Sequence, residues 1–133
     1  MRLPGKVFVL LSVSLMLSSC AAAPLPEFKV EQTERDIIPN ASSLTGVEPG
    51  STRFVGEVES ADLYMARGDG DILCLVEARP EASYNVFCGD GLGVGVELES
   101  GTRIELGTFR FPESQIGDGE RAQLSESVTV ITD

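Results

Sequence analysis

The chain contains no histidine and no tryptophan, and only two of its 133 residues are tyrosine. Histidine is the usual general base and a usual ligand of zinc and copper, so its absence excludes Ser-His-Asp and Cys-His catalytic arrangements. Tryptophan is the largest aromatic platform for stacking against a sugar ring. An enzymatic interpretation would therefore have to depend on the carboxylates, which are abundant.

Basic residues are also scarce, because 10 lysines and arginines stand against 21 aspartates and glutamates. Removal of residues 1–19 takes away Arg2 and Lys6 and no acid, which changes the net charge from −11 to −13. A domain with this charge is repelled by nucleic acid and by anionic lipid surfaces. We therefore expect no nucleic-acid binding, and the acidity serves either solubility or the capture of a cationic partner.

No apolar run is long enough to cross a membrane. The longest extends from Val7 to Leu17, whereas a spanning helix needs about 20 apolar residues. Arg2 and Lys6 precede this run and small residues follow it, as in a secretory signal peptide. The run ends in Leu17-Ser18-Ser19-Cys20, which resembles the bacterial lipobox. The resemblance implies cleavage before Cys20, acylation of Cys20 and stable anchoring at the extracytoplasmic face of the cell membrane.

Once Cys20 is assigned to lipid, Cys74 and Cys88 remain as an even pair in an exported segment, where disulfides persist. If they face each other across two antiparallel strands, the period of two fixes the remaining cross-strand couples. These are Val76 with Val86 and Ala78 with Tyr84 on one face, and Leu75 with Phe87 and Glu77 with Asn85 on the other. Residues 79–83 then form a loop of a permitted length, in which Pro80 suits a type I turn. We therefore predict a hairpin closed by a Cys74–Cys88 disulfide.

Two regions follow the signal helix predicted over 1–19. Residues 20–46 keep no helical or strand period, and we expect them to form a lipid-anchored flexible tether. Residues 47–133 alternate short apolar runs with turn-forming residues, as an antiparallel all-β domain does. Candidate strands cover 52–58, 62–67, 71–78, 83–88, 92–98, 103–111 and 127–132. The polar stretch 113–126 is predicted to be a loop, with one helical turn near Ala122.

The predicted fold class is a small antiparallel sheet or meander, sandwich-like or barrel-like, with one hairpin disulfide. Leu92, Val94, Val96 and Leu98 share one face of their strand, and the glycines between them either allow a close approach or mark a bulge. The apolar parity changes between Leu106 and Phe109, which predicts a bulge or bend near Gly107.

Aspartate and glycine alternate in three short stretches, at 68–71, 89–91 and 117–120. Such dipeptides favour tight turns, while calcium ligation is the alternative. None of the stretches completes a twelve-residue calcium-binding loop, so we assign no metal site. The glycine-rich stretch 91–95 leads into a strand and does not open a helix, which argues against phosphate binding.

The run Glu-Pro-Gly-Ser-Thr-Arg-Phe-Val-Gly-Glu at 48–57 resembles the D-P-x-S-T-R-x-x-G segment of small actinobacterial secreted and lipoprotein domains. As in those domains, an aromatic strand follows at 63–67, then an Ile-x-Cys-Leu-like strand at 72–76 and a second cysteine followed by glycine at 88–91. The likeness covers about 48–98. It implies the disulfide and the compact β-domain, and it implies no activity because the family carries none that is known.

Taken together, the patterns predict a lipid-anchored extracytoplasmic binding or accessory protein that is not an enzyme. Its partner would be the membrane, through lipid, together with another envelope protein or a cationic ligand. We assign no catalytic, cofactor-binding or metal-binding residue, and the assigned positions are Cys20 for lipid and Cys74 and Cys88 for the disulfide. Two alternatives stay open. One is a small cell-envelope hydrolase that uses carboxylates, and the other is an inhibitor of extracellular enzymes that presents loop 79–83.

Overall fold

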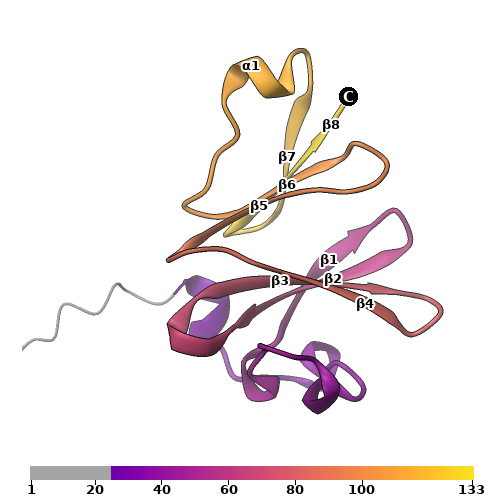
Figure 1. Ribbon diagram of the computed structural model, residues 1–133, viewed down its shortest axis with the longest axis vertical. Helices are drawn as coiled ribbons and strands as arrows, with labels where there is room; N and C mark the ends of the chain where they lie inside the picture. Colours follow the sequence, from indigo (N-terminus) through magenta and orange to yellow (C-terminus); the bar gives the residue numbers. More distant parts are fainter. Residues whose placement is uncertain (1–24) are drawn as a thin grey trace, which may run out of the picture.

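The computed structural model describes residues 25–133, which form two four-stranded antiparallel sheets. Sheet 1 is a meander in the order β1 (Arg53–Val58), β2 (Ala61–Arg67), β3 (Leu73–Arg79) and β4 (Ser83–Cys88). Sheet 2 has the order β5 (Gly93–Glu97), β6 (Arg103–Gly107), β8 (Val128–Thr132) and β7 (Glu120–Ser125). The sheets face each other as two layers (Figure 1), so the predicted all-β class is confirmed in its sandwich-like form.

The hairpin of β3 and β4 has the predicted register, in which Cys74 lies opposite Cys88 and the two are joined by a disulfide. The N–H of Gly89 donates to the carbonyl of Leu73 at 3.1 Å, so the neighbouring cysteine pair is of the non-hydrogen-bonded kind. In that kind of pair the side chains lie closest together, which suits a cross-strand disulfide. Arg79 pairs with Ser83, and Ala82 at the end of the turn has a positive φ of 55°. The turn is therefore a three-residue loop that ends in a left-handed residue, and it is two residues shorter than the predicted loop 79–83 because the strands pair as far as Arg79 and Ser83.

The main core lies between the two sheets and follows from the alternation of side chains along each strand. Its members are Val55, Leu63, Met65, Leu73, Leu75, Val94, Val96, Leu98, Ile104, Leu106 and Val128. Val94, Val96 and Leu98 share the buried face as predicted, whereas Leu92 precedes β5 and is 39 % exposed. One layer of apolar side chains thus holds the two sheets together.

The stretch 113–126 differs from the predicted loop, because it contains the short helix α1 (Glu113–Ile116) and the edge strand β7. Ala122 lies in β7 and pairs with Val130, so the helical turn predicted near it lies earlier in the chain. All of the first four residues of β7 are exposed, and Leu124 reaches the core only through a bulge. The strand carries no apolar alternation, and it is held by its hydrogen bonds to β8.

The strand predicted over 103–111 ends at Gly107, where φ is +65° and the chain bends away. The predicted bend is therefore present, and it turns the segment after β6 back across the outer face of sheet 2. There the ring of Phe109 lies against Gly95, at a place where a Cβ on that glycine would overlap the ring. Phe111 packs edge-on against Phe109 with ring centroids 4.9 Å apart. The glycines of β5 thus make room for an aromatic cover.

The segment 25–46 differs from the flexible tether predicted over 20–46. It forms three single 3-10 turns, η1 (Pro26–Lys29), η2 (Glu34–Asp36) and η3 (Ala41–Ser43). Ile38 is 1 % exposed and packs with Ala41 and Val47 on the outer face of sheet 1. β3 is therefore a central strand covered on both faces, as its apolar composition predicts. Segment 25–46, which was expected to be flexible, covers its outer face (Figure 1).

Two carboxylates attach this segment to the strands. The N–H groups of Thr33 and Phe54 donate to Asp36 at 2.8 and 2.9 Å, so η2 is fixed against the edge of β1. Burial raises the pKa of Asp36, but these donors outweigh it and the pKa lies below its ordinary value. The N–H of Ser127 donates to Glu27 at 2.8 Å and thereby links η1 to the turn between β7 and β8.

Candidate functional site

Three hairpin turns lie together at one end of the molecule, on the right in Figure 1 and opposite η1. We call this the hairpin end; it comprises the turns at 59–60, 80–82 and 98–102, which join β1 to β2, β3 to β4 and β5 to β6. Glu59 connects two of them, because its carboxylate accepts hydrogen bonds from Ser100 and Thr102, both at 2.7 Å. The bond from Thr102, followed by that from Ser100, holds the pKa of Glu59 below its ordinary value.

The outer face of sheet 1 is hollowed at this end. The hollow has a volume of about 490 Å³ and is lined by side chains of β1 to β4, by turn 80–82 and by Pro39 and its neighbours. Tyr64 and Tyr84 contribute aromatic walls, and the hydroxyl of Tyr84 donates to the carbonyl of Pro39 at 3.2 Å. Burial, reinforced by the charge of Asp62, raises the pKa of Tyr64. We call this cavity the outer hollow.

A second cavity of about 420 Å³ opens between the sheets, on the other side of the β3–β4 hairpin. We call it the inner hollow. Sheet 1 contributes Glu77, Arg79, Asn85 and Phe87 to it, and the end of β5 with its turn contributes Glu97, Leu98 and Glu99. Arg79 lines both hollows, so the two cavities flank the same hairpin.

The buried acid of the inner hollow is held in a closed set of hydrogen bonds. Glu77 is 2 % exposed, and both of its oxygens accept from the guanidinium of Arg79, at 3.2 and 3.3 Å. The side-chain amide of Asn85 donates to it at 2.9 Å. Both oxygens of this carboxylate are therefore engaged in a two-point ion pair, and one of them also accepts from Asn85.

A second buried acid lies on the outer face of sheet 2. Glu105 is fully buried, and it accepts from Arg121 at 3.0 Å and from the N–H of Phe111 at 2.7 Å. Burial raises the pKa of Glu105, but the bonds from Arg121 and Phe111 outweigh burial and the pKa lies below its ordinary value. Arg121 also contacts Glu113 at 2.9 Å. This pair holds the segment after β6 on the sheet, and it lies in a different sheet from Glu77.

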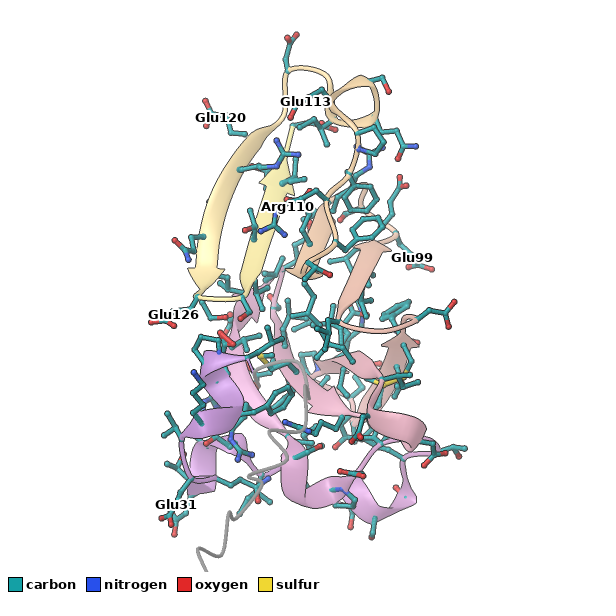
Figure 2. All side chains as sticks on the ribbon, turned by 90° about the vertical axis from the view of Figure 1, so that its left-hand side faces the viewer. Glu31, Glu99, Arg110, Glu113, Glu120 and Glu126 are labelled. Carbon is teal, nitrogen blue, oxygen red and sulfur yellow. A yellow bond between two sulfur atoms is a disulfide. The ribbon has the colours of Figure 1, made fainter. Side chains whose placement is uncertain are left out.

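Most other carboxylates point into solvent. Figure 2 labels Glu31, Glu99, Glu120 and Glu126, whose side chains extend outward from separate elements, and also Glu113, which is paired with Arg121. Glu99 carries no ion pair within 25–133, and Glu97 has only a long contact of 3.7 Å with Arg103. The hairpin end therefore combines two hollows with acidic side chains at their rims.

Of the residues assigned from sequence, Cys74 and Cys88 are joined and confirmed, whereas Cys20 lies outside the described residues. The three aspartate–glycine stretches lie apart, in the turn with η5 (Asp69–Asp71), in the link from β4 to β5 and in the link from α1 to β7. Residues 25–133 contain no group of three histidine, cysteine or acidic side chains arranged to hold a metal ion.

The burial of Glu77 can be predicted from the sequence, whereas that of Glu105 cannot. Glu77 lies on the same face as Leu75, so the predicted register already turns it inward, and its partners Arg79 and Asn85 are near in the chain. Glu105 alternates with Ile104 and Leu106 and therefore reads as solvent-facing. It is buried by residues 108–113, and only the bend at Gly107 hints at that cover.

Comparison with known proteins adds no relative. Within 25–133, no helix combines the length and the apolar character that a transmembrane span requires. The lipobox and the likeness of 48–98 to actinobacterial domains stay predictions. The chain matches no protein-family model, no curated protein and no solved structure.

Proposed function

We propose that the chain is a lipid-anchored binding or accessory protein of the extracytoplasmic face of the cell membrane. It would act through recognition of a cationic partner in the envelope. The observation that carries this proposal is the distribution of charge in the folded domain. Its acidic side chains are largely free at the surface, while its basic side chains are engaged within the fold.

All 21 acidic residues lie within 25–133, and six of them form ion pairs with N···O distances of 2.9–3.8 Å. Fifteen carboxylates of the described chain are therefore outside ion pairs. Of the eight basic residues in the same range, five form those pairs, and Arg53 and Arg110 donate to main-chain carbonyls. Such a surface raises the local concentration of cations and speeds the encounter with a basic partner.

The fold also suits presentation of the hairpin end away from the membrane. Cys20 precedes Leu25 by five residues, and an extended chain of that length spans at most about 18 Å. Lipid on Cys20 would therefore keep η1 close to the bilayer. The hairpin end lies on the opposite side of the domain from η1 (Figure 1), and residues of its turns line both hollows.

The anchor is tested by Cys20→Ser, with Ser19→Ala as the matched control because it keeps a small residue before the cysteine. We expect Cys20→Ser to release the protein to the medium or to leave an uncleaved precursor, whereas Ser19→Ala stays in the membrane fraction. Cell fractionation and mass spectrometry of the amino terminus measure both. An acylated, membrane-bound Cys20→Ser protein would refute the anchor.

The binding role is tested by crosslinking in cells, followed by pull-down of the acylated form. We expect to recover one specific envelope partner. The amount recovered should fall when the crosslinking is done at high salt, because salt screens an acidic surface. Failure to recover any partner, together with hydrolysis of an envelope polymer by the purified chain, would overturn it in favour of a hydrolase.

A further inference from the structure

Each sheet ends in strands whose outer main-chain groups have no neighbouring strand, and proteins usually protect such edges. In β1 a bulge interrupts the edge, and Asp36 accepts the N–H of Phe54. In β7 another bulge is combined with the charged residues Glu120 and Arg121. In β5 two glycines weaken the strand, and Glu97 ends it. Three of the four edges are thus protected or poorly suited to pairing.

The edge of β4 carries none of these devices. Its sequence, Ser-Tyr-Asn-Val-Phe-Cys, contains no charge, proline or bulge, and it is rich in strand-forming side chains. Because Leu73 bonds to Gly89, the register places the N–H and C=O groups of Tyr84, Val86 and Cys88 on the side away from β3. No hydrogen bond within 25–133 uses the main-chain groups of Tyr84 or Val86 on that side.

We propose that β4 is a docking edge that receives an extended, lysine- or arginine-bearing segment of a partner protein as a fifth strand of sheet 1. Alternate side chains of such a strand would point to opposite faces of the sheet. On one face they would lie beside Tyr84 and the outer hollow, and on the other beside Asn85, Phe87 and the inner hollow. Residues of β4 therefore line both cavities, Tyr84 the outer one and Asn85 and Phe87 the inner one.

Charge selects the occupant of this surface. Glu57 lines the outer hollow, and Glu97 and Glu99 line the inner one. Arg79 lines both hollows, but its guanidinium is paired with Glu77, so basic side chains on either face of the docked strand would meet carboxylates that Arg79 does not neutralise. A second copy of the chain is disfavoured, because pairing β4 with β4 would bring two domains of net charge −13 together. The inference rests on the proposed function and names the partner surface on which that function would depend.

The test uses the full chain as cells make it, in a non-ionic detergent, and a blocked fluorescent peptide of sequence Thr-Lys-Val-Arg-Val-Lys-Thr. Fluorescence anisotropy measures its affinity, and hydrogen exchange with mass spectrometry locates it. We expect slower exchange over 83–88 when the peptide is bound. Two matched peptides, one with glutamate in place of every basic residue and one with methylated central amide nitrogens, are each expected to bind at least about tenfold more weakly.

A protein variant tests the same edge. Val86→Pro removes an outward N–H and no bond to β3, and proline is tolerated on edge strands in that orientation. It should weaken peptide binding by about tenfold or more, whereas the control Val86→Ile should bind as the natural chain does. If Val86→Pro fails to fold, the methylated peptide decides the question with the natural protein.

The outcomes separate this proposal from the proposed function. Equal binding of the methylated peptide, protection elsewhere than 83–88, no peptide binding at all, or dimers paired through β4 would each overturn the docking edge. If the partner pull-down still succeeds in those cases, the binding role stands and another surface performs it. If the peptide binds at β4 while no envelope partner is recovered from cells and the purified chain hydrolyses an envelope polymer, the edge is supported and the proposed function fails.

Discussion

Removal of the disulfide between β3 and β4 is the perturbation whose size follows most directly from the structure. Cys74 and Cys88 are separated by 14 positions, so the bridge closes a loop of 15 residues. In the chain-entropy account, a loop of that length destabilises the unfolded chain by about 3 kcal/mol. Part of this gain is lost because the hairpin is local and keeps some order after unfolding.

The expected change in melting temperature is therefore large for a domain of this size. With about 4 °C per kcal/mol for a domain of roughly 100 residues, reduction should lower the melting temperature by about 10 °C. Circular dichroism is the suitable readout, since the chain has no tryptophan. The oxidised and the fully reduced protein are compared at the same concentration, and alkylation with mass spectrometry confirms the thiol state.

A double variant, Cys74→Ala with Cys88→Ser, gives the same comparison without reductant. It adds a small cavity at Cys74, which is fully buried, so its melting temperature should be somewhat below that of the reduced protein. A shift of less than 5 °C on complete reduction would refute the reasoning. Such a small shift would mean that the unfolded chain has as little conformational freedom without the disulfide as with it.

Two further substitutions test the outer face of sheet 2. Gly95→Ala should lower the free energy of unfolding by about 1–3 kcal/mol in urea titrations, because the added Cβ would overlap the Phe109 ring. The control Gly50→Ala should change it little, since a Cβ there meets open space. Equal effects of the two substitutions would argue against the aromatic cover. Glu105→Gln should cost about 2 kcal/mol at pH 7, because it discharges a buried partner of Arg121. The pKa of Glu105 in the folded protein is lowered, so its contribution to the free energy of unfolding is complete above about pH 4.5 and is lost as the pH falls through the folded pKa. The difference in stability between Glu105→Gln and the natural chain should therefore shrink toward pH 3. A stability difference that does not change with pH would contradict the lowered pKa.

The parts of the fold that were predictable depend on local signals. In the β3–β4 hairpin, the alternation of side chains, the cysteine pair and Pro80 all act within sixteen residues, and together they specify one register. The core face of β5 is predictable for the same reason, since Val94 and Val96 alternate with glycines. In these segments, the physical cause of the structure lies next to the residues that show it.

The parts that were not predictable depend on distant partners. β7 is a strand because β8 offers it hydrogen bonds, and its exposed residues carry no period. Ile38 and Ala41 are too sparse to form a pattern, but they find a ready apolar surface on sheet 1. For the candidate site, the sequence places Glu77 on the correct face but gives no sign that turns from both sheets meet at one end.

The bond between Glu27 and the Ser127 amide joins positions 100 residues apart. Closing so long a loop is entropically expensive, and contacts of that separation form late in folding. Folding should therefore proceed from local hairpins to pairing of the two layers, and then to packing of the segment 25–46 against them. A chain of this kind completes its fold near residue 25, after its last strand has paired with the sheet.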